Sequence, residues 1–235
     1  MKEIKGVIFD YGGTIDTNAR HWAEVLWEQY VATGISVKKE EFREAYVHGE
    51  RTLAKFPLVK PYHNFYDVLK IKTKIQFDYL KERAWLSASA TGDVEVATRC
   101  YAYVKEVLAR TLPVVQRISQ HYRLVLVSNF YGNIETILKD FGLNVCFAEV
   151  VESSVVGLRK PDPAIYALGV QKMGFLAEEI LVVGDSFSKD VVPAKHIGCK
   201  VAWLRGEGWG DEEIDESLPD YIIEDLSELL PLLNI

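Results

Sequence analysis

The amino-acid sequence predicts an α/β protein: helices cover a parallel sheet, and a helical module is inserted after the first strand. Three observations predict this fold. Apolar segments rich in β-branched residues recur along the chain, helical patterns separate the later segments, and residues 17–110 contain helical patterns without a convincing buried strand. Strands that alternate with helices are typical of α/β sheets.

Continuous apolar runs mark the expected strands. They cover residues 5–10, 122–130, 179–186 and 200–205. Because their apolar residues are consecutive rather than alternating, both faces of each strand should be buried, as in a parallel sheet covered by helices. A last short strand and a closing amphipathic helix are expected within 221–233. The acidic segment 206–220 predicts a solvated loop.

Helices are expected between these strands. Segment 133–142 ends at a glycine, and segment 162–174 has proline near its start and glycine at its end, the usual order of helix signals. Segment 188–198 is a shorter candidate that contains Pro193.

The insertion shows helical spacing of apolar residues around 22–30, around 79–86 and from 94 to 112. We therefore predict a core domain of residues 1–16 plus 111–235 and an all-helical cap domain of residues 17–110. The aromatic residues of this cap, Trp22 and Phe65 among them, and His21 are interpreted as structural rather than functional.

Composition narrows the function classes. The chain has 235 residues and a formal net charge of −7, which argues against a nucleic-acid partner. Its three cysteines form no CxxC pair, as expected in a reducing compartment. The N-terminal residues are too polar for a secretory signal, and no apolar run is long enough for a membrane span. We expect a soluble, cytoplasmic protein without membrane partners.

Polar residues follow the ends of several predicted strands. Asp10 follows the first strand, Ser128 and Asn129 end the second, and Asp185 follows a later one, with Asp190 five residues beyond it. The carboxyl ends of parallel strands share one sheet edge, so these side chains should converge. Aspartate oxygens suit Mg²⁺, and loop amides and hydroxyls suit phosphate.

One lysine belongs to the same group. Lys160 precedes Pro161, which favours an extended backbone, and stands just ahead of a predicted helix. Its point charge would offset the negative groups around it. An aspartate such as Asp10 can attack phosphorus and so divide one difficult displacement into two steps.

These motifs resemble those of the haloacid dehalogenase superfamily of hydrolases. The resemblance is carried, in the family's order, by DYGGT (10–14), VSN (127–129), RKPDP (159–163) and GDSFSKD (184–190), with an insertion after the first motif. It covers essentially the whole chain. It implies a Rossmann-like, doubly wound core with a helical cap, and Mg²⁺ as cofactor.

The resemblance also implies residue roles. Asp10 is the nucleophile and a Mg²⁺ ligand, Lys160 organises charge, and Ser128 binds the phosphoryl group. Together, the expected site comprises catalytic residues Asp10, Lys160 and Ser128; substrate-binding residues Ser128, Asn129, Gly13 and Lys160; and metal ligands Asp10, Gly12 (through its carbonyl), Asp185 and Asp190. Thr14 is interpreted as support for the nucleophile loop.

The first motif departs from the family pattern at Gly12, where many family phosphatases carry an aspartate that acts as general acid and then base. Losing such a group typically costs about 10²–10⁴-fold in rate. Four alternatives follow. The protein is a phosphatase whose acid comes from the cap, from water or is not needed; a phosphonate-cleaving enzyme with a cap lysine such as Lys55; a dehalogenase, whose branch lacks the Gly184–Asp185 pair; or a non-enzymatic binder of phosphorylated ligands.

The sequence favours the first alternative: a Mg²⁺-dependent hydrolase that uses an aspartate nucleophile on a small phosphorylated metabolite.

Overall fold

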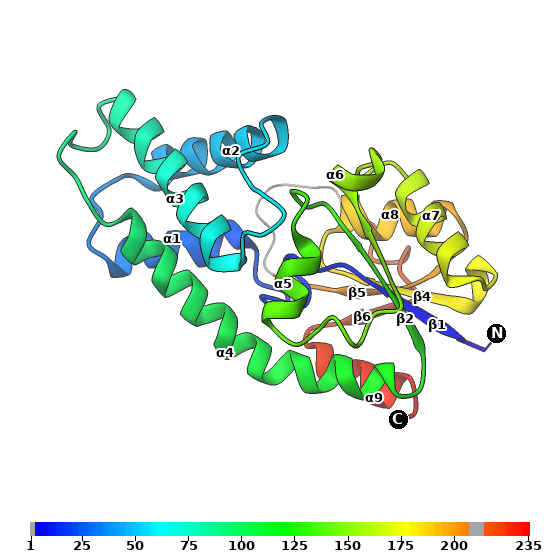
Figure 1. Cartoon of the computed structure of the whole chain (residues 1–235). Helices are drawn as coiled ribbons and strands as arrows, with labels where there is room; N and C mark the ends of the chain where they lie inside the picture. Colours follow the sequence, from blue (N-terminus) through cyan, green and yellow to red (C-terminus); the bar gives the residue numbers. More distant parts are fainter. Residues whose placement is uncertain (1–2, 207–213) are drawn as a thin grey trace.

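The computed structural model describes residues 3–206 and 214–235. A six-stranded parallel sheet forms the centre of the core, and the cap helices lie to one side of it (Figure 1). Every strand pair is parallel. In spatial order the strands are β3 (Glu149–Glu152), β2 (Arg123–Ser128), β1 (Gly6–Phe9), β4 (Ile180–Gly184), β5 (Lys200–Leu204) and β6 (Tyr221–Ile223). The chain builds outward from β1 on one side through β2 and β3, and on the other through β4 to β6. The order reverses between β1 and β4, the place where such sheets bind ligands.

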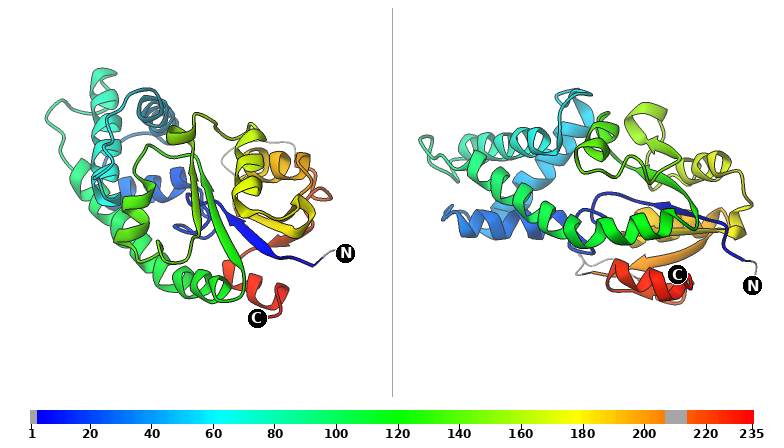
Figure 2. Two further views of the ribbon diagram at one scale, coloured as in Figure 1. Left: turned by 45° about the vertical axis from the view of Figure 1, so that its right-hand side comes forward. Right: turned by 60° about the horizontal axis from the view of Figure 1, so that its bottom comes forward.

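Helices cover both faces of this sheet. The core helices are α5 (Ile134–Asp140), α6 (Ser153–Val156), α7 (Ala164–Met173), α8 (Val192–His196) and α9 (Leu229–Leu232). Within β1, Val7 and Phe9 share a buried cluster with residues of α5 and α9. Ile8, between them, belongs to a second cluster with residues of α7 and α8. Figure 2 shows the two layers of helices with the sheet between them. The doubly wound sheet is therefore confirmed.

The expected strands are all present, each somewhat shorter than the apolar run that predicts it. The C-terminal segment also folds as expected, with β6 followed by a 3₁₀ turn and α9. Strand β3 was not predicted. Its sequence, Glu-Val-Val-Glu, offers only two apolar residues, and its first two residues are only partly buried because it lies at the sheet edge. An edge strand of this kind lacks the long apolar run that identifies a central one.

The cap consists of helices alone, as expected, since residues 17–110 contain no strand. Its helices are α1 (Trp22–Ala32), α2 (Lys39–Lys55), α3 (Phe65–Glu82) and the first part of α4 (Asp93–Ser119). The helical pattern expected around 79–86 is wrong in its second half. Helix α3 ends at Glu82, and Ala84 adopts a positive φ of 56° that interrupts the helix.

Helix α4 runs from the cap along the sheet without interruption (Figures 1 and 2). The predicted domain boundary at residues 110 and 111 falls inside this helix. Pro113 also lies inside it, and a proline has no N–H with which to bond the carbonyl four residues earlier. The division into core and cap stays a prediction, and α4 belongs to both parts.

Segment 188–198 is helical as expected, but it begins with an unusual turn. Residues Phe187–Val191 form a π-turn, in which the Val191 N–H reaches back to the Ser186 carbonyl, and Pro193 lies in the first turn of α8. This wide turn brings Asp190 back toward the end of β4. Such turns are frequent at functional sites.

Two further expectations concern loops and cysteines. Within the segment 206–220, residues 207–213 lie outside the described residues, while 214–220 contain neither helix nor strand. All three cysteines are buried and unpaired, as core residues would be. Among the described residues, no helix has the length and apolar character that a bilayer crossing requires.

Candidate active site

The predicted site residues meet where the sheet order reverses. Asp10 follows β1, Ser128 ends β2, and Asp185 follows β4, so three neighbouring strands deliver polar groups to one edge. Asp10 is held there by its N–H, which donates to the Val183 carbonyl of β4 at 3.0 Å. The indole of Trp203 on β5 donates to the Asp185 carbonyl at 2.8 Å. Hydrogen bonds from β4 and β5 therefore hold the backbone of Asp10 and Asp185, and with it the starting point of each carboxylate.

Lys160 lies between two of these carboxylates. Its Nζ is 2.7 Å from Asp10 Oδ1 and 2.7 Å from Asp190 Oδ1, and its side chain is only 3% exposed. The Tyr166 hydroxyl of α7 also donates to Asp190 Oδ1, at 2.6 Å, and the Ser186 N–H donates to Asp190 Oδ2 at 2.9 Å. Asp190 thus has donors on both oxygens and serves to hold Lys160 in place.

Negative charge exceeds positive charge at this point. Oxygens of Asp10, Asp185 and Asp190 lie within 4.8 Å of one another, and among the described residues Lys160 is the one cation bonded to them. Burial raises the pKa of Asp10 above its usual value, although Lys160 opposes the shift. Burial and the charges of Asp190 and Asp10 raise the pKa of Asp185 well above its usual value. Such crowded carboxylates fit a hard cation such as Mg²⁺.

The donor set fits such an ion best at Asp10 and Asp185. Lys160 occupies Oδ1 of Asp10, and no described side chain donates to its Oδ2. Thr14 donates to Asp185 Oδ1 at 3.0 Å, which orients that carboxylate and agrees with the supporting role expected for Thr14. Asp190 already accepts three hydrogen bonds, so it would assist from outside the ligand set.

Two adjacent glycines in the loop that follows Asp10 have opposite surroundings. Gly13 has a φ of +91°, and a Cβ there would overlap the carboxylate of Asp185. A Cβ at Gly12 would meet no atom within 4 Å. Glycine is therefore required at 13 by close approach and backbone conformation, whereas the space at 12, where an aspartate was expected by the family pattern, is open.

Ser128 and Asn129 both line the site, but they are engaged differently. No described residue hydrogen-bonds the buried Ser128 hydroxyl, which stays available to a ligand. The Asn129 carboxamide instead accepts from the Lys160 N–H at 2.9 Å and donates to the Lys160 carbonyl at 3.1 Å. Asn129 therefore positions the lysine loop, and it retains one N–H donor and one acceptor position for a ligand.

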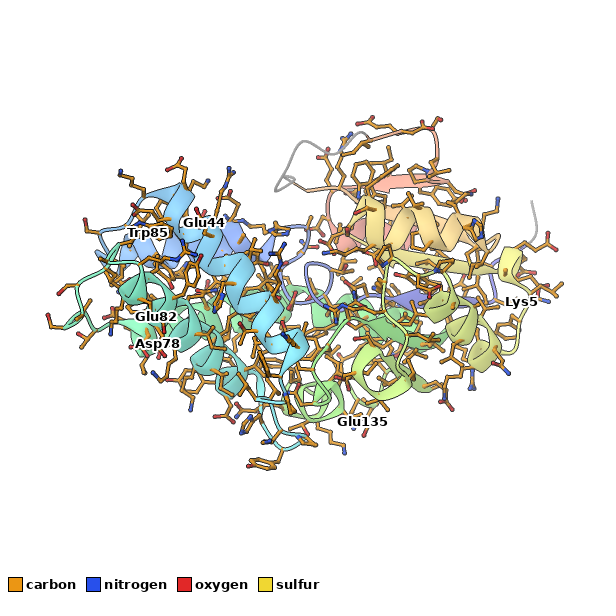
Figure 3. The ribbon with its side chains drawn as sticks, turned by 90° about the horizontal axis from the view of Figure 1, so that it is seen from above. Lys5, Glu44, Asp78, Glu82, Trp85 and Glu135 are labelled. Carbon is orange, nitrogen blue, oxygen red and sulfur yellow. The ribbon has the colours of Figure 1, made fainter. Side chains whose placement is uncertain are left out.

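A cavity of about 520 Å³ lies over these residues. We call the following core residues of its lining the floor: Asp10, Gly12, Gly13, Ser128, Lys160, Asp185 and Asp190. The cap contributes the roof, which consists of His21, Trp22, Tyr46, Glu50, Phe65, Val68, Leu69 and Lys72. Figure 3 views the molecule from above, with the cap, marked by Glu44 and Trp85, at one end and Lys5, at the base of the sheet, at the other.

The roof was missed in the sequence analysis. Trp22, Phe65 and His21 were interpreted as structural, yet all three line the cavity. Lys55, the cap lysine considered for chemistry, is exposed on α2 and lies against the ring of Phe56, away from the cavity. The cavity instead holds Lys72. A signal existed, because Lys72 interrupts a buried apolar stripe of α3 with an expensive charge.

Asp16 connects the nucleophile loop to the cap. This fully buried carboxylate accepts from the Gly13 N–H at 2.7 Å and from the Trp22 indole N–H at 2.9 Å. Burial raises its pKa to about 7, although both hydrogen bonds oppose the shift. Asp16 therefore fixes the turn that follows Asp10 and ties it to the first residue of α1.

The site therefore combines carboxylates at the switch point of a doubly wound sheet, a lysine buried between them and a helical cap above. This combination is typical of hydrolases that have a Rossmann-like core and a cap. The comparison with family models gives the same class. The model described as haloacid dehalogenase-like hydrolase matches residues 4–198, and this chain belongs to that family.

Relatives and solved structures agree with this assignment. The chain is 26% identical to a glyceraldehyde 3-phosphate phosphatase of Pyrococcus furiosus, over all of this chain and 95% of the relative. It is also 26% identical to a phosphoglycolate phosphatase of Yersinia pestis, with the same coverage. The magnesium-bound orthorhombic form of the HAD-hydrolase YfnB of Bacillus subtilis matches over the full length of both chains, with a TM-score of 0.62 and 20% identity. This last likeness shows the fold.

Proposed function

We propose that this protein is a Mg²⁺-dependent phosphatase of small phosphorylated metabolites, with Asp10 as its nucleophile. The observation that carries the proposal is the position of Lys160, buried between Asp10 and Asp190 at the switch point of the sheet. A lysine in this place favours the ionised form of Asp10, against the effect of burial, and leaves a crowded set of carboxylates that still favours a divalent cation.

The relatives support the same reaction class. Those named above are a glyceraldehyde 3-phosphate phosphatase and a phosphoglycolate phosphatase, and both names specify small phosphate monoesters. A cavity of about 520 Å³ is of the size that holds a small molecule. A solved relative with the same fold is described as bound to magnesium.

The chemistry follows from the floor. The phosphoryl group binds at the Ser128 hydroxyl, at the Gly13 loop and beside Lys160. An Asp10 carboxylate oxygen forms a bond to phosphorus while the ester oxygen leaves with its electron pair, and water then attacks the aspartyl-phosphate to release phosphate. A bound Mg²⁺, held by Asp10, Asp185 and the Gly12 carbonyl, would neutralise charge on the phosphoryl oxygens. The leaving oxygen takes its proton from water in the open space at Gly12.

The phosphonate-cleaving alternative requires an uncharged cap amine near Asp10. Lys55 does not line the cavity, and Lys72 does. Burial alone would lower the pKa of Lys72, but Glu50 and Tyr46 raise it above its usual value, so its amine stays protonated and is a poor nucleophile. This arrangement favours the phosphatase over the phosphonate-cleaving enzyme.

Turnover of nitrophenyl phosphate with and without Mg²⁺ tests the proposal, because its leaving group hardly needs a proton from the enzyme. We expect Mg²⁺-dependent release of nitrophenol, reduced at least about 10⁴-fold by Asp10→Asn. Asp78→Asn, an exposed aspartate of α3, is the matched control and should behave as wild type. Activity retained in Asp10→Asn would overturn the assigned nucleophile. Phosphate binding without turnover would favour the non-enzymatic alternative.

A further inference from the structure

We propose that the Glu50–Lys72 ion pair in the roof selects the leaving group, so that this enzyme favours phosphate esters of uncharged, hydroxyl- or carbonyl-bearing carbon chains over esters that also carry a carboxylate. The inference rests on the proposed phosphatase function and names the substrate class of the same cavity.

The pair joins two cap helices over the site. Lys72 Nζ of α3 lies 2.6 Å from Glu50 Oε1 of α2, and the Lys72 side chain is 10% exposed. Its ammonium also lies 5.8 Å from the Trp22 ring centroid and 5.9 Å from that of Tyr131. Tyr131 belongs to the core and donates its hydroxyl to Glu50 Oε2 at 2.9 Å. The pair is thus fixed from both the cap and the core.

The Glu50–Lys72 pair faces the region of the cavity in which the leaving group of the substrate must lie. The same cavity is bounded by the floor residues and by Glu50 and Lys72. The phosphoryl group must lie against Asp10, so the remainder of the ester extends toward the roof. Among the described cap residues that line the cavity, Glu50 and Lys72 are the two that carry a charge, and most of the others are aromatic or aliphatic.

Charge at the roof is balanced. Burial alone would raise the pKa of Glu50, but Lys72 and the Tyr131 hydroxyl bring it below its usual value, so Glu50 is ionised. Lys72 is protonated for the reciprocal reason. A carboxylate on the substrate would meet Glu50 as well as Lys72, and like charges in contact at a poorly solvated site are strongly unfavourable.

The pair still has hydrogen-bonding capacity for a neutral group. Among the described residues, the buried Glu50 Oε1 has Lys72 Nζ at 2.6 Å as its ion-pair partner and accepts no further hydrogen bond. An ammonium has three N–H donors, and a carboxylate oxygen accepts at two positions. A hydroxyl can donate to Glu50 and accept from Lys72, and a carbonyl can accept from Lys72 alone.

Cations on the core side of the cavity do not change this balance. Arg159 and Lys189 line the cavity from exposed positions, where water screens much of their charge, and Lys189 acts on the pKa of Glu50 in the same direction as Lys72. Arg205 is paired with Glu216 and Glu224. Lys72 is therefore the buried cation that a substrate meets beyond the phosphoryl site, and Glu50 neutralises it.

Three esters with one carbon skeleton test the inference. Glycerol 3-phosphate, glyceraldehyde 3-phosphate and 3-phosphoglycerate differ at the far carbon, which is an alcohol, an aldehyde or a carboxylate. In wild type we expect kcat/KM for the alcohol or the aldehyde to exceed that for the acid at least about tenfold. Glu50→Gln removes the negative charge and retains the shape, and it should shift the ratio at least about tenfold toward the acid. Glu44→Gln, on the exposed face of α2, is the matched control and should leave the ratio unchanged.

Binding to an inert protein separates this inference from the proposed function. Dissociation constants of the same esters for Asp10→Asn and for Asp10→Asn/Glu50→Gln, measured by calorimetry, should show the same order and the same shift. A ratio near one in wild type, or a ratio that Glu50→Gln leaves unchanged, would overturn the inference even if phosphate is released. If wild type hydrolyses none of the esters and no nitrophenyl phosphate, the proposed function fails, and the binding ratios alone decide whether the pair selects by charge.

Discussion

The floor and the roof of the cavity are built on opposite principles. The charged groups of the floor are held by defined partners, as when Lys160 bridges Asp10 and Asp190, and only a few of its polar atoms are left for a ligand. The roof comes from helices and is mainly apolar, with one ion pair, Glu50–Lys72. The floor is thus suited to one fixed chemistry, and the roof to a choice among ligands. Substitutions in the floor should therefore affect catalysis and stability together, and those in the roof should affect selectivity.

The largest effect is expected from Lys160→Met. It leaves buried carboxylates without their bonded cation, and removal of one partner of a buried ion pair costs about 3–5 kcal/mol. We expect turnover to fall at least about 10³-fold and the free energy of unfolding to fall within that range. Phosphate release and urea unfolding, each with and without Mg²⁺, measure the two losses.

Mg²⁺ should restore part of the stability of Lys160→Met, because the bound ion offsets the repulsion among the carboxylates that Lys160 no longer neutralises. Lys172→Met is the control: its pair with Glu149 lies on the surface and contributes about 0–1 kcal/mol. Equal losses of stability in these two variants would contradict the special position of Lys160.

A second comparison uses adjacent glycines of the floor. Gly13→Ala forces a side chain into the Asp185 carboxylate at a φ of +91° and should cost about 1–3 kcal/mol and raise the Mg²⁺ concentration needed for half-maximal activity. Gly12→Ala enters open space and should cost less than about 1 kcal/mol. Thermal unfolding and Mg²⁺ titration of both variants measure these effects. Equal losses in Gly12→Ala and Gly13→Ala would contradict the expected difference between the two positions.

His21 gives the roof a dependence on pH. Burial, aided by Lys189, lowers its pKa to about 4, from 6.5 in the unfolded chain. The unfolded state therefore binds more protons as the pH falls through 6.5, so the His21 contribution makes the folded state progressively less stable down to about pH 4. His21→Asn keeps an N-cap acceptor for α1 without titrating. Urea unfolding at pH 7.5 and pH 5 should show a loss about 1–2 kcal/mol greater in wild type than in this variant.

The smallest effect concerns a residue next to the nucleophile. Tyr11 is fully buried between Phe65 and Phe130, and its hydroxyl has no hydrogen-bond partner among the described residues. Tyr11→Phe should be neutral or stabilising by up to about 1 kcal/mol, with turnover unchanged. Tyr30→Phe, which removes a hydrogen bond to Gln76 Oε1, should destabilise by about 1 kcal/mol and serves as the contrast. A larger loss in Tyr11→Phe would reveal a partner for its hydroxyl.

The floor could be predicted from sequence because strand ends bring consecutive motifs together. Asp10, Ser128 and Asp185 each end an apolar run, and parallel pairing places such ends at one edge. The roof could not be predicted, because Trp22, Glu50 and Lys72 come from three helices whose crossing depends on side-chain packing. Strand β3 was missed because an edge strand needs few apolar residues. The hydrogen bonds of the Asn129 side chain could not be predicted either, since they reach the main chain of Lys160, 31 positions away in the sequence.

The continuous helix α4 has a mechanical consequence. The chain passes between core and cap through the short segment 17–21 and through α4. The core end of α4 is anchored by the buried Val114, Val115 and Ile118. A helix anchored in this way resists sliding but bends most readily at Pro113, where one intrahelical hydrogen bond is missing. Thr111, beside that point, donates to the Ile15 carbonyl of the nucleophile loop at 2.8 Å. A bend of α4 at this point would therefore displace the loop that carries Asp10, so the position of the cap and the position of the Asp10 carboxylate are mechanically coupled.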